Sequence, residues 1–181
     1  MRALNVSLTV LLLSVASLVA QEPTATQPYD DVDAYRVYSL LLPHEEAYSF
    51  AKDALMIQED AVPEDISGAC LRQTDASRFK GAIAGYNRTN RTKWLFQRQF
   101  QIAKPYRIVS PKLISALPDR PQGAVSYVRM SAVGFNRDKT QAVVFVASSC
   151  GGLCGHWQFH ILEKAHGKWS EIPVAMCVGA S

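Results

Sequence analysis

Residues 141–165 read QAVVFVASSCGGLCGHWQFHILEKA, two runs rich in β-branched and aromatic residues on either side of a glycine turn. This pattern predicts two antiparallel strands, at about 141–149 and 156–164, joined through the GGL segment. Turn signals in NRDK and in His166-Gly167 predict two further strands, at about 126–135 and 168–177. We therefore expect a four-stranded antiparallel meander at the C-terminal end of the chain.

Three pairings set the register that we expect for this meander: Ala165 opposite Lys168, Cys150 opposite Cys154, and residue 135 opposite residue 140. One face of the sheet then carries only apolar side chains: Val128, Met130, Ala132, Val143, Phe145, Ala147, Trp157, Phe159, Ile161, Ile172, Val174 and Met176. A random register would rarely align apolar residues on four strands, because side chains alternate between the two faces. The pattern therefore predicts one buried face.

The chain before the meander predicts helices and short strands. Acidic residues before 32–42 and Pro43 after it favour a helix there, and apolar residues at helical spacing favour a second over 75–87. Segments 54–59 and 106–109 are typical of strands, and Pro111 favours a short helix after the second. The predicted fold class is α+β: the meander, extended by one or two N-terminal strands, packed against two or three helices.

The first residues are typical of a secretory signal peptide. Arg2 precedes an apolar run from Leu8 to Ala20, which is short for a membrane span of ~20 predominantly apolar residues. We expect cleavage after Ala20, with Ser17 as the alternative. The predicted organisation is a signal peptide over 1–20, a disordered segment over 21–31 and a single α+β domain over 32–181, with no membrane span in the secreted or periplasmic product.

The four cysteines, Cys70, Cys150, Cys154 and Cys177, all follow the predicted signal peptide. An even number in an oxidising compartment favours disulfides over free thiols or zinc. Cysteines that flank a three-residue hairpin turn face each other at a separation that a disulfide can bridge. We expect the pairs Cys150–Cys154 and Cys70–Cys177, and the same register leaves Cys154–Cys177 as an alternative.

The Cys-x3-Cys-x-His-x3-His pattern of residues 150–160 also raises the question of a metal site. On a strand, His156 and His160 would be about 13 Å apart at ~3.3 Å per residue, so one ion cannot bind both. A site made of Cys150, Cys154 and His156 stays open as an alternative. We expect no metal and no cofactor.

Residues 133–169 bear a resemblance to known proteins. VGFNRDKTQAVVFV, CGGLCG and LEKAHGKW resemble the VGFNxDxTQA…CGGLCG…LEKxxGKW motif of a family of uncharacterised secreted bacterial proteins. The likeness is strong over 130–170 and weak elsewhere. It implies a bacterial exported protein and assigns no catalytic residue. His156, Trp157 and His160 depart from the family pattern, which has small residues and tyrosines there.

Charge is unevenly distributed along the chain. Residues 22–65 hold eleven acids and two bases, whereas residues 72–107 hold nine bases and one acid, interleaved with aromatic residues. This basic segment predicts an anion-binding site, with Arg88, Arg91, Lys93 and Arg98 as its candidate residues and an anionic envelope polymer as a partner; nucleic acid is not expected. The alternative is that the basic segment packs against the acidic N-terminal part.

No pattern of a common hydrolase, zinc protease or nucleotide-binding loop occurs in the sequence. His44, Glu45 and Glu46 are typical of a solvated helix start rather than of a general base. We therefore expect a non-catalytic binding or structural domain of the bacterial cell envelope. The alternative is an envelope enzyme, hydrolase-like or metal-assisted, that uses residues near the CGGLCGH hairpin.

Overall fold

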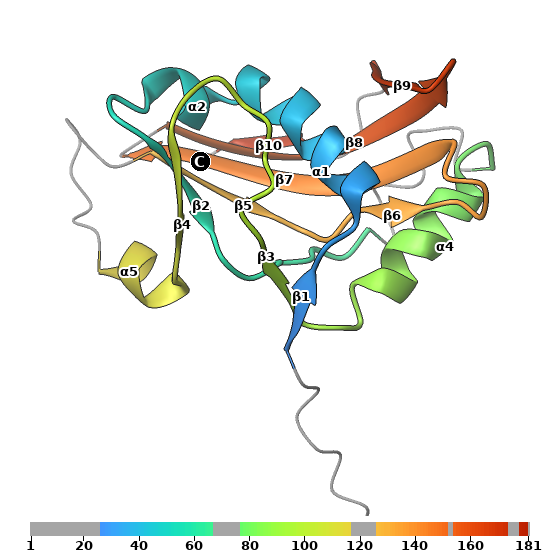
Figure 1. Ribbon diagram of the computed structural model, residues 1–181, viewed down its shortest axis with the longest axis horizontal. Helices are drawn as coiled ribbons and strands as arrows, with labels where there is room; N and C mark the ends of the chain where they lie inside the picture. Colours follow the sequence, from blue (N-terminus) through green and yellow to red (C-terminus); the bar gives the residue numbers. More distant parts are fainter. Residues whose placement is uncertain (1–25, 67–76, 117–125, 152–153, 174–177, 181) are drawn as a thin grey trace, which may run out of the picture.

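The computed structural model describes residues 26–66, 77–116, 126–151, 154–173 and 178–180. Residues 141–165 form its longest hairpin, with strands β7 (Gln141–Gly151) and β8 (Cys154–Ala165) (Figure 1). The predicted pairings of Val143 with Ile161 and of Ala147 with Trp157 are confirmed. Strand β9 (Lys168–Ile172) follows at the expected register, with Ala165 opposite Lys168.

The sheet is larger than the predicted meander, and it is mixed. Its order is β10-β8-β7-β5-β2-β4, with β6 also paired to β7 and β9 to β8. Strands β2 (Leu55–Gln58) and β4 (Tyr106–Val109) extend it, as expected for N-terminal strands. However, β2 pairs in parallel with both β4 and β5 (Tyr127–Met130), so the purely antiparallel sheet was wrong.

The expected single strand over 126–135 is divided into β5 and β6 (Gly134–Phe135). Phe135 lies opposite Ala142, and Met130 lies opposite Val146, so the register is shifted from the predicted one. A shift of one residue moves side chains to the other face of a sheet. Met130 therefore belongs to the face opposite to the one we expected.

Both faces of the sheet are buried, so the prediction of one buried face was wrong. Ala142, Val144 and Val146 pack with α1 (Val32–Leu41), whereas Val143, Phe145 and Ala147 pack with α4 (Lys80–Thr89). Figure 1 shows α1 and α2 (Glu46–Phe50) on one side of the long strands and α4 on the other. A strand buried on both faces is a continuous apolar run, as AVVFVA is.

Buried contacts fix the two helical layers to the sheet. The Asp31 carboxylate caps α1 by accepting from Asp33 N, and the fully buried Tyr38 donates to Ser131 O at 2.7 Å. On the other face α4 approaches β6 at glycines: a Cβ on Gly134 would lie 2.1 Å from Tyr86 N, and one on Gly85 would lie 2.0 Å from Phe135 O. The short helix α5 (Pro111–Ser115) begins at Ser110 and buries no residue.

The last predicted strand, over 168–177, ends earlier than expected. Strand β9 stops at Ile172, and strand β10 (Val178–Ala180) pairs with β8 so that Gly179 lies opposite Trp157. Trp157 was expected opposite Met176 in the core, but it is 40% exposed. Gly179 has no side chain to cover the Trp157 indole, and β10 is the edge strand of the sheet. The indole therefore remains open to solvent instead of lying in the core.

The segment before α1 also differs from the prediction. Gln27–Tyr29 forms β1, which pairs in parallel with β3 (Trp94–Phe96), although we expected disorder over 21–31. Tyr29 is buried, and its hydroxyl accepts from Val133 N. The Tyr29 ring packs within a cluster of aromatic side chains. The local sequence QPYDD does not predict this packing.

None of the helices among the described residues is long and apolar enough to span a membrane. The predicted signal peptide, Cys70 and Cys177 lie outside the described residues.

Candidate functional site

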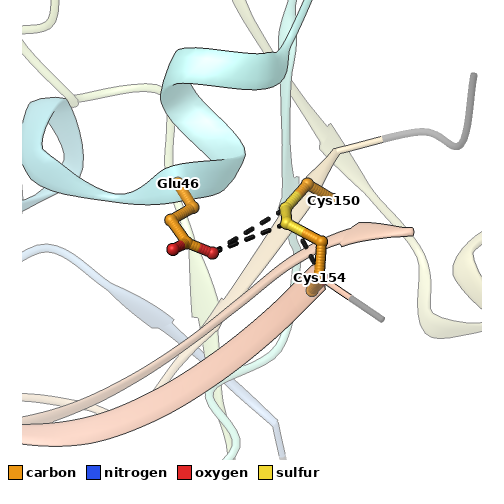
Figure 2. A group of neighbouring side chains, drawn as sticks. All are labelled: Glu46, Cys150 and Cys154. Carbon is orange, nitrogen blue, oxygen red and sulfur yellow. Dashed lines mark hydrogen bonds between the residues drawn. A yellow bond between two sulfur atoms is a disulfide. The ribbon is translucent and has the colours of Figure 1, made fainter. Parts of the chain in front are cut away.

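The hairpin between β7 and β8 carries a disulfide at its tip. The predicted disulfide is confirmed: Cys150 and Cys154 are bonded, with their Cα atoms 5.2 Å apart (Figure 2). Their predicted pairing in the strand register was wrong, because the register shifts after Ser149 and Cys154 lies opposite Gly151. Both side chains are partly exposed. Because Cys154 is bonded to Cys150, the alternative pair Cys154–Cys177 is not formed.

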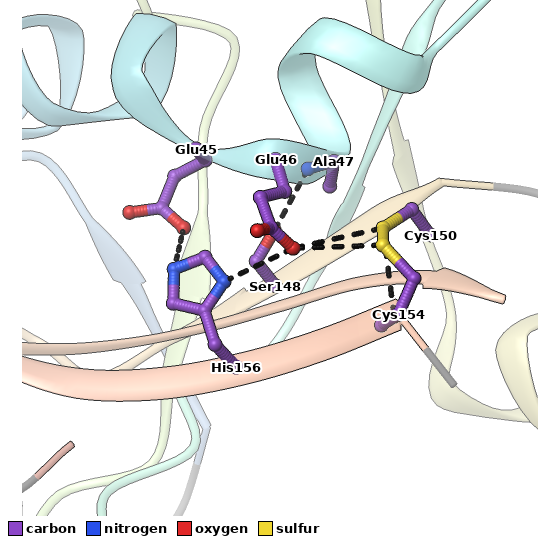
Figure 3. Close-up of a disulfide and its surroundings, with 7 residues drawn as sticks. All are labelled: Glu45, Glu46, Ala47, Ser148, Cys150, Cys154 and His156. Carbon is purple, nitrogen blue, oxygen red and sulfur yellow. Dashed lines mark hydrogen bonds and ion pairs between the residues drawn. A yellow bond between two sulfur atoms is a disulfide. The ribbon is translucent and has the colours of Figure 1, made fainter. Parts of the chain in front are cut away.

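Helix α2 lies over this hairpin tip because its first turn is tied to β7. A short 3-10 turn (Leu42–His44) that contains Pro43 follows α1, and Glu45 adopts an extended conformation before α2 begins. Ala47 N then donates to the buried hydroxyl of Ser148 at 2.8 Å. Ser148 is the register partner of His156, so Glu45 and Glu46 come to lie against His156 (Figure 3).

Glu46 links the disulfide to His156. Its Oε2 lies 3.5 Å from Cys154 Sγ, 3.9 Å from Cys150 Sγ and 3.6 Å from His156 Nδ1 (Figures 2 and 3). A disulfide has no S–H proton, so the sulfur contacts supply no hydrogen bond while the disulfide is intact. His156 Nδ1 is itself buried without a hydrogen-bond partner.

Glu45 lies on the other side of His156 and is buried, with 2% of its side chain exposed. Its Oε2 is 3.1 Å from His156 Nε2, and its Oε1 is 3.5 Å from His160 Nε2. The contact between Glu45 Oε2 and His156 Nε2 is short, but its angle is poor, and Glu45 Oε2 accepts no hydrogen bond. We expected a solvated helix start at 44–46, which was wrong for Glu45, since the sheet covers it.

His160 connects Glu45 to β9. Its Nδ1 lies 2.6 Å from Glu171 Oε1, and the imidazole is 3% exposed. Burial alone would lower the pKa of His160, but hydrogen bonds to Glu171 and Glu45 outweigh it and raise the pKa above the usual value of a histidine. The two carboxylates therefore favour the imidazolium form of the ring.

The structure separates the two histidines, as strand spacing predicted. They share one face of β8 but approach different oxygens of Glu45. Within the described residues, the one group of three or more possible metal ligands whose atoms lie within 4.8 Å of one another is Glu46, Cys150 and Cys154. His156 borders this group through Glu46.

Sequence reasoning missed Glu45, Glu46 and Glu171 as partners of the histidines. A signal was present, because two histidines on one face of a largely buried strand require counter-charges. It could not identify the carboxylates, since they come from the start of α2, from the residue before it and from β9, and not from β8.

The predicted anion-binding residues lie on α4 and in the segments that follow it, before and after β3. Arg88, Arg91, Lys93 and Arg98 are exposed, and none of them forms an ion pair with another described residue. Arg91 and Lys93 border a hollow of about 560 Å³ that also contains Glu59 and Asp60. The hollow itself therefore contains both signs of charge.

The acidic N-terminal part is paired with other bases. Asp31 binds Lys139 at 2.8 Å, and Asp33 binds Lys164 at 3.1 Å. Of residues 77–107, Arg78 forms an ion pair, with Glu163. No ion pair joins the basic segment to the acidic N-terminal part among the described residues. The alternative that the two neutralise each other is therefore not supported there.

No family model, no curated protein and no solved structure matches this chain.

Proposed function

We propose that this protein is an exported, non-catalytic domain that binds an acidic polymer of the bacterial cell envelope. The binding surface would be the exposed side of α4 and the loop that follows it, with Arg88, Arg91 and Lys93 as its central residues. The observation that carries the proposal is that these bases are exposed and without ion-pair partners among the described residues.

The exposed side of α4 is basic for a geometric reason. Ala82, Ile83, Gly85 and Tyr86 face the sheet, which leaves Lys80, Ala84 and Arg88 outside at four-residue spacing. Lys80 and Arg88 are separated by about 12 Å at ~1.5 Å per residue, and Arg91 follows one turn later. The helix contains no acidic residue, so an extended anion would meet positive charge along its length.

Such a surface suits a polymer better than a small anion. The bases are exposed and spaced along a line, so each contributes a screened interaction of modest strength, and only their sum gives useful affinity. Because the hollow beside Lys93 also contains Glu59 and Asp60, the chain of the polymer would lie across the bases rather than inside it.

Binding to lipopolysaccharide micelles and to polygalacturonate tests this proposal, with double-stranded DNA as a comparison. We expect saturable binding that weakens steeply between about 20 mM and 200 mM salt, where the screening length falls. The triple variant R88E/R91E/K93E should lose at least tenfold in affinity. The triple variant R107E/K112E/K168E changes the charge equally at other exposed positions and should retain most binding.

Equal losses in the two triple variants would show attraction by net charge alone and would contradict the proposal. So would the lack of binding to either polymer at low salt. Tighter binding to DNA than to both envelope polymers would assign the surface to nucleic acid instead.

A further inference from the structure

We propose that Cys150, Cys154, His156 and Glu46 form a Zn²⁺ site that becomes available when the Cys150–Cys154 disulfide is reduced. This site is independent of the basic surface on α4. In the oxidised protein the sulfur–sulfur bond leaves no place for an ion between the two ligands. The disulfide would thus act as a gate on metal binding.

The distances around Glu46 agree with one tetrahedral ion. Zinc–ligand bonds of about 2.0–2.3 Å place neighbouring ligand atoms roughly 3.3–3.8 Å apart. Glu46 Oε2 is 3.5 Å from Cys154 Sγ, 3.9 Å from Cys150 Sγ and 3.6 Å from His156 Nδ1. Three of the six ligand–ligand edges therefore already lie near the required length. His156 lies outside the group of atoms within 4.8 Å of one another, so the sulfurs would have to rotate toward it once reduction frees them.

The chemistry of the ligand set also favours zinc. Two thiolates, an imidazole nitrogen and a carboxylate oxygen are ligands that Zn²⁺ accepts, and Cys-x3-Cys lies within the spacing of known structural sites. The Glu46 carboxylate points at the sulfurs, and His156 Nδ1 points at the same carboxylate oxygen (Figure 3). The buried Nδ1 atom has no hydrogen bond in the oxidised protein, and an ion would supply its missing partner.

Glu45 and His160 would support the site from behind. When His156 Nδ1 binds an ion, its Nε2 carries the proton; Glu45 Oε2 lies 3.1 Å away, and a rotation of the ring would turn this contact into a hydrogen bond. A carboxylate behind a histidine ligand fixes the ring and strengthens it as a donor. Glu45 is held in turn by His160, and His160 by Glu171, so the imidazole lies on a rigid base.

The two chemical steps balance. A dithiol reductant transfers two electrons and two protons by thiol–disulfide exchange, so that it becomes a cyclic disulfide while Cys150 and Cys154 become thiols. Zn²⁺ then binds both sulfurs and releases the two thiol protons to solvent. The partly exposed cysteines at the hairpin tip are accessible for the first step.

The full exported chain, treated with a phosphine reductant that offers no thiolate ligand, tests the proposal. Titration with Zn²⁺ against a chromophoric chelator should show one bound equivalent in protein whose Cys150–Cys154 disulfide is reduced. It should show none in protein whose Cys150–Cys154 disulfide is intact. Co²⁺ should give the thiolate charge-transfer bands of a tetrahedral site. H156A and E46A should weaken binding at least tenfold, and E45Q about tenfold. H166A, a histidine in an exposed turn, should have no effect.

The remaining cysteines, Cys70 and Cys177, require a separate control. Zinc should protect Cys150 and Cys154 in the unmutated protein from alkylation, as read by peptide mass analysis, while Cys70 and Cys177 react at the same rate with and without metal. Protection of Cys70 or Cys177 instead, or full zinc binding by C150S/C154S, would overturn the proposal. So would zinc binding that is equal in oxidised and reduced protein.

Discussion

His156 Nε2 lies 3.1 Å from Oε2 of the buried Glu45, a contact between strand β8 and the residue that precedes α2. The same carboxylate reaches His160 with its other oxygen. One acidic side chain thus holds two histidines of one strand face, and α2 is fixed over the disulfide hairpin as a consequence.

Replacing Glu45 with glutamine should destabilise the protein. The amide keeps the shape but removes a charge partner from His160, which is nearly fully buried. Hydrogen bonds to charged groups contribute about 1.5–3 kcal/mol, and we expect a loss of that size in the free energy of unfolding, measured by urea denaturation at pH 7. Glu46→Gln is the control: its side chain is 54% exposed, so the oxidised variant should change by less than about 0.5 kcal/mol.

His160 should make stability depend on pH in a defined direction. Its pKa in the folded protein is raised by Glu171 and Glu45 in spite of burial. The imidazolium therefore stabilises the fold fully below the unfolded pKa of about 6.5, and this contribution is lost as the pH rises through the higher folded value.

Denaturation across pH 5.5–9 should show this loss, and His160→Gln should flatten it. NMR titration should place the pKa of His160 above 6.5. A value below 6.5 would contradict the raised pKa, since burial would then outweigh the two carboxylates.

The close approach of α4 to β6 should make Gly85 and Gly134 intolerant of a side chain. A methyl group at either position would meet backbone atoms at about 2 Å, so the helix must move off the sheet. We expect Gly85→Ala and Gly134→Ala to cost about 3 kcal/mol or more in thermal or chemical unfolding. At Gly81 a Cβ would meet the Asn136 side chain at 3.2 Å, so Gly81→Ala should stay within about 1 kcal/mol of the unmutated protein.

Asn90 should be far more sensitive than Asn87, its neighbour in the repeated triplet NRTNRT. The Asn90 side chain donates to Tyr86 O and Ala132 O and accepts from Ala132 N. Asn90→Ala leaves these buried groups of Ala132 unpaired and should cost about 2–3 kcal/mol in the free energy of unfolding. The exposed Asn87, changed to alanine, should alter it by less than about 0.5 kcal/mol; equal effects would contradict the role of Asn90 as a clamp.

Local patterns predicted the elements better than their arrangement. Strands β2, β4 and β7–β9, helix α1 and the turn that pairs Ala165 with Lys168 follow from alternation, capping and turn residues close together in the chain. The register of β5 was missed because a break at 131–133 changes which face Met130 occupies. The second buried face was missed although AVVFVA contains it, since we followed only one of its two alternating sets.

The candidate site divides in the same way. Cys150, Cys154 and the separation of His156 from His160 could be predicted, because a hairpin register and the rise of a strand determine them. Glu45 could not, since HEE after a proline is the same pattern whether a helix start is solvated or covered.

The sequence by itself determined the hairpin, its disulfide and the clustering of positive charge after residue 72. Only the tertiary structure decided that α2 covers the hairpin tip, that Glu45 is buried between two histidines and that Arg88, Arg91 and Lys93 stay exposed. The physical reason is that local patterns reflect neighbouring residues, whereas the burial of a charge depends on segments that fold back from a hundred residues away.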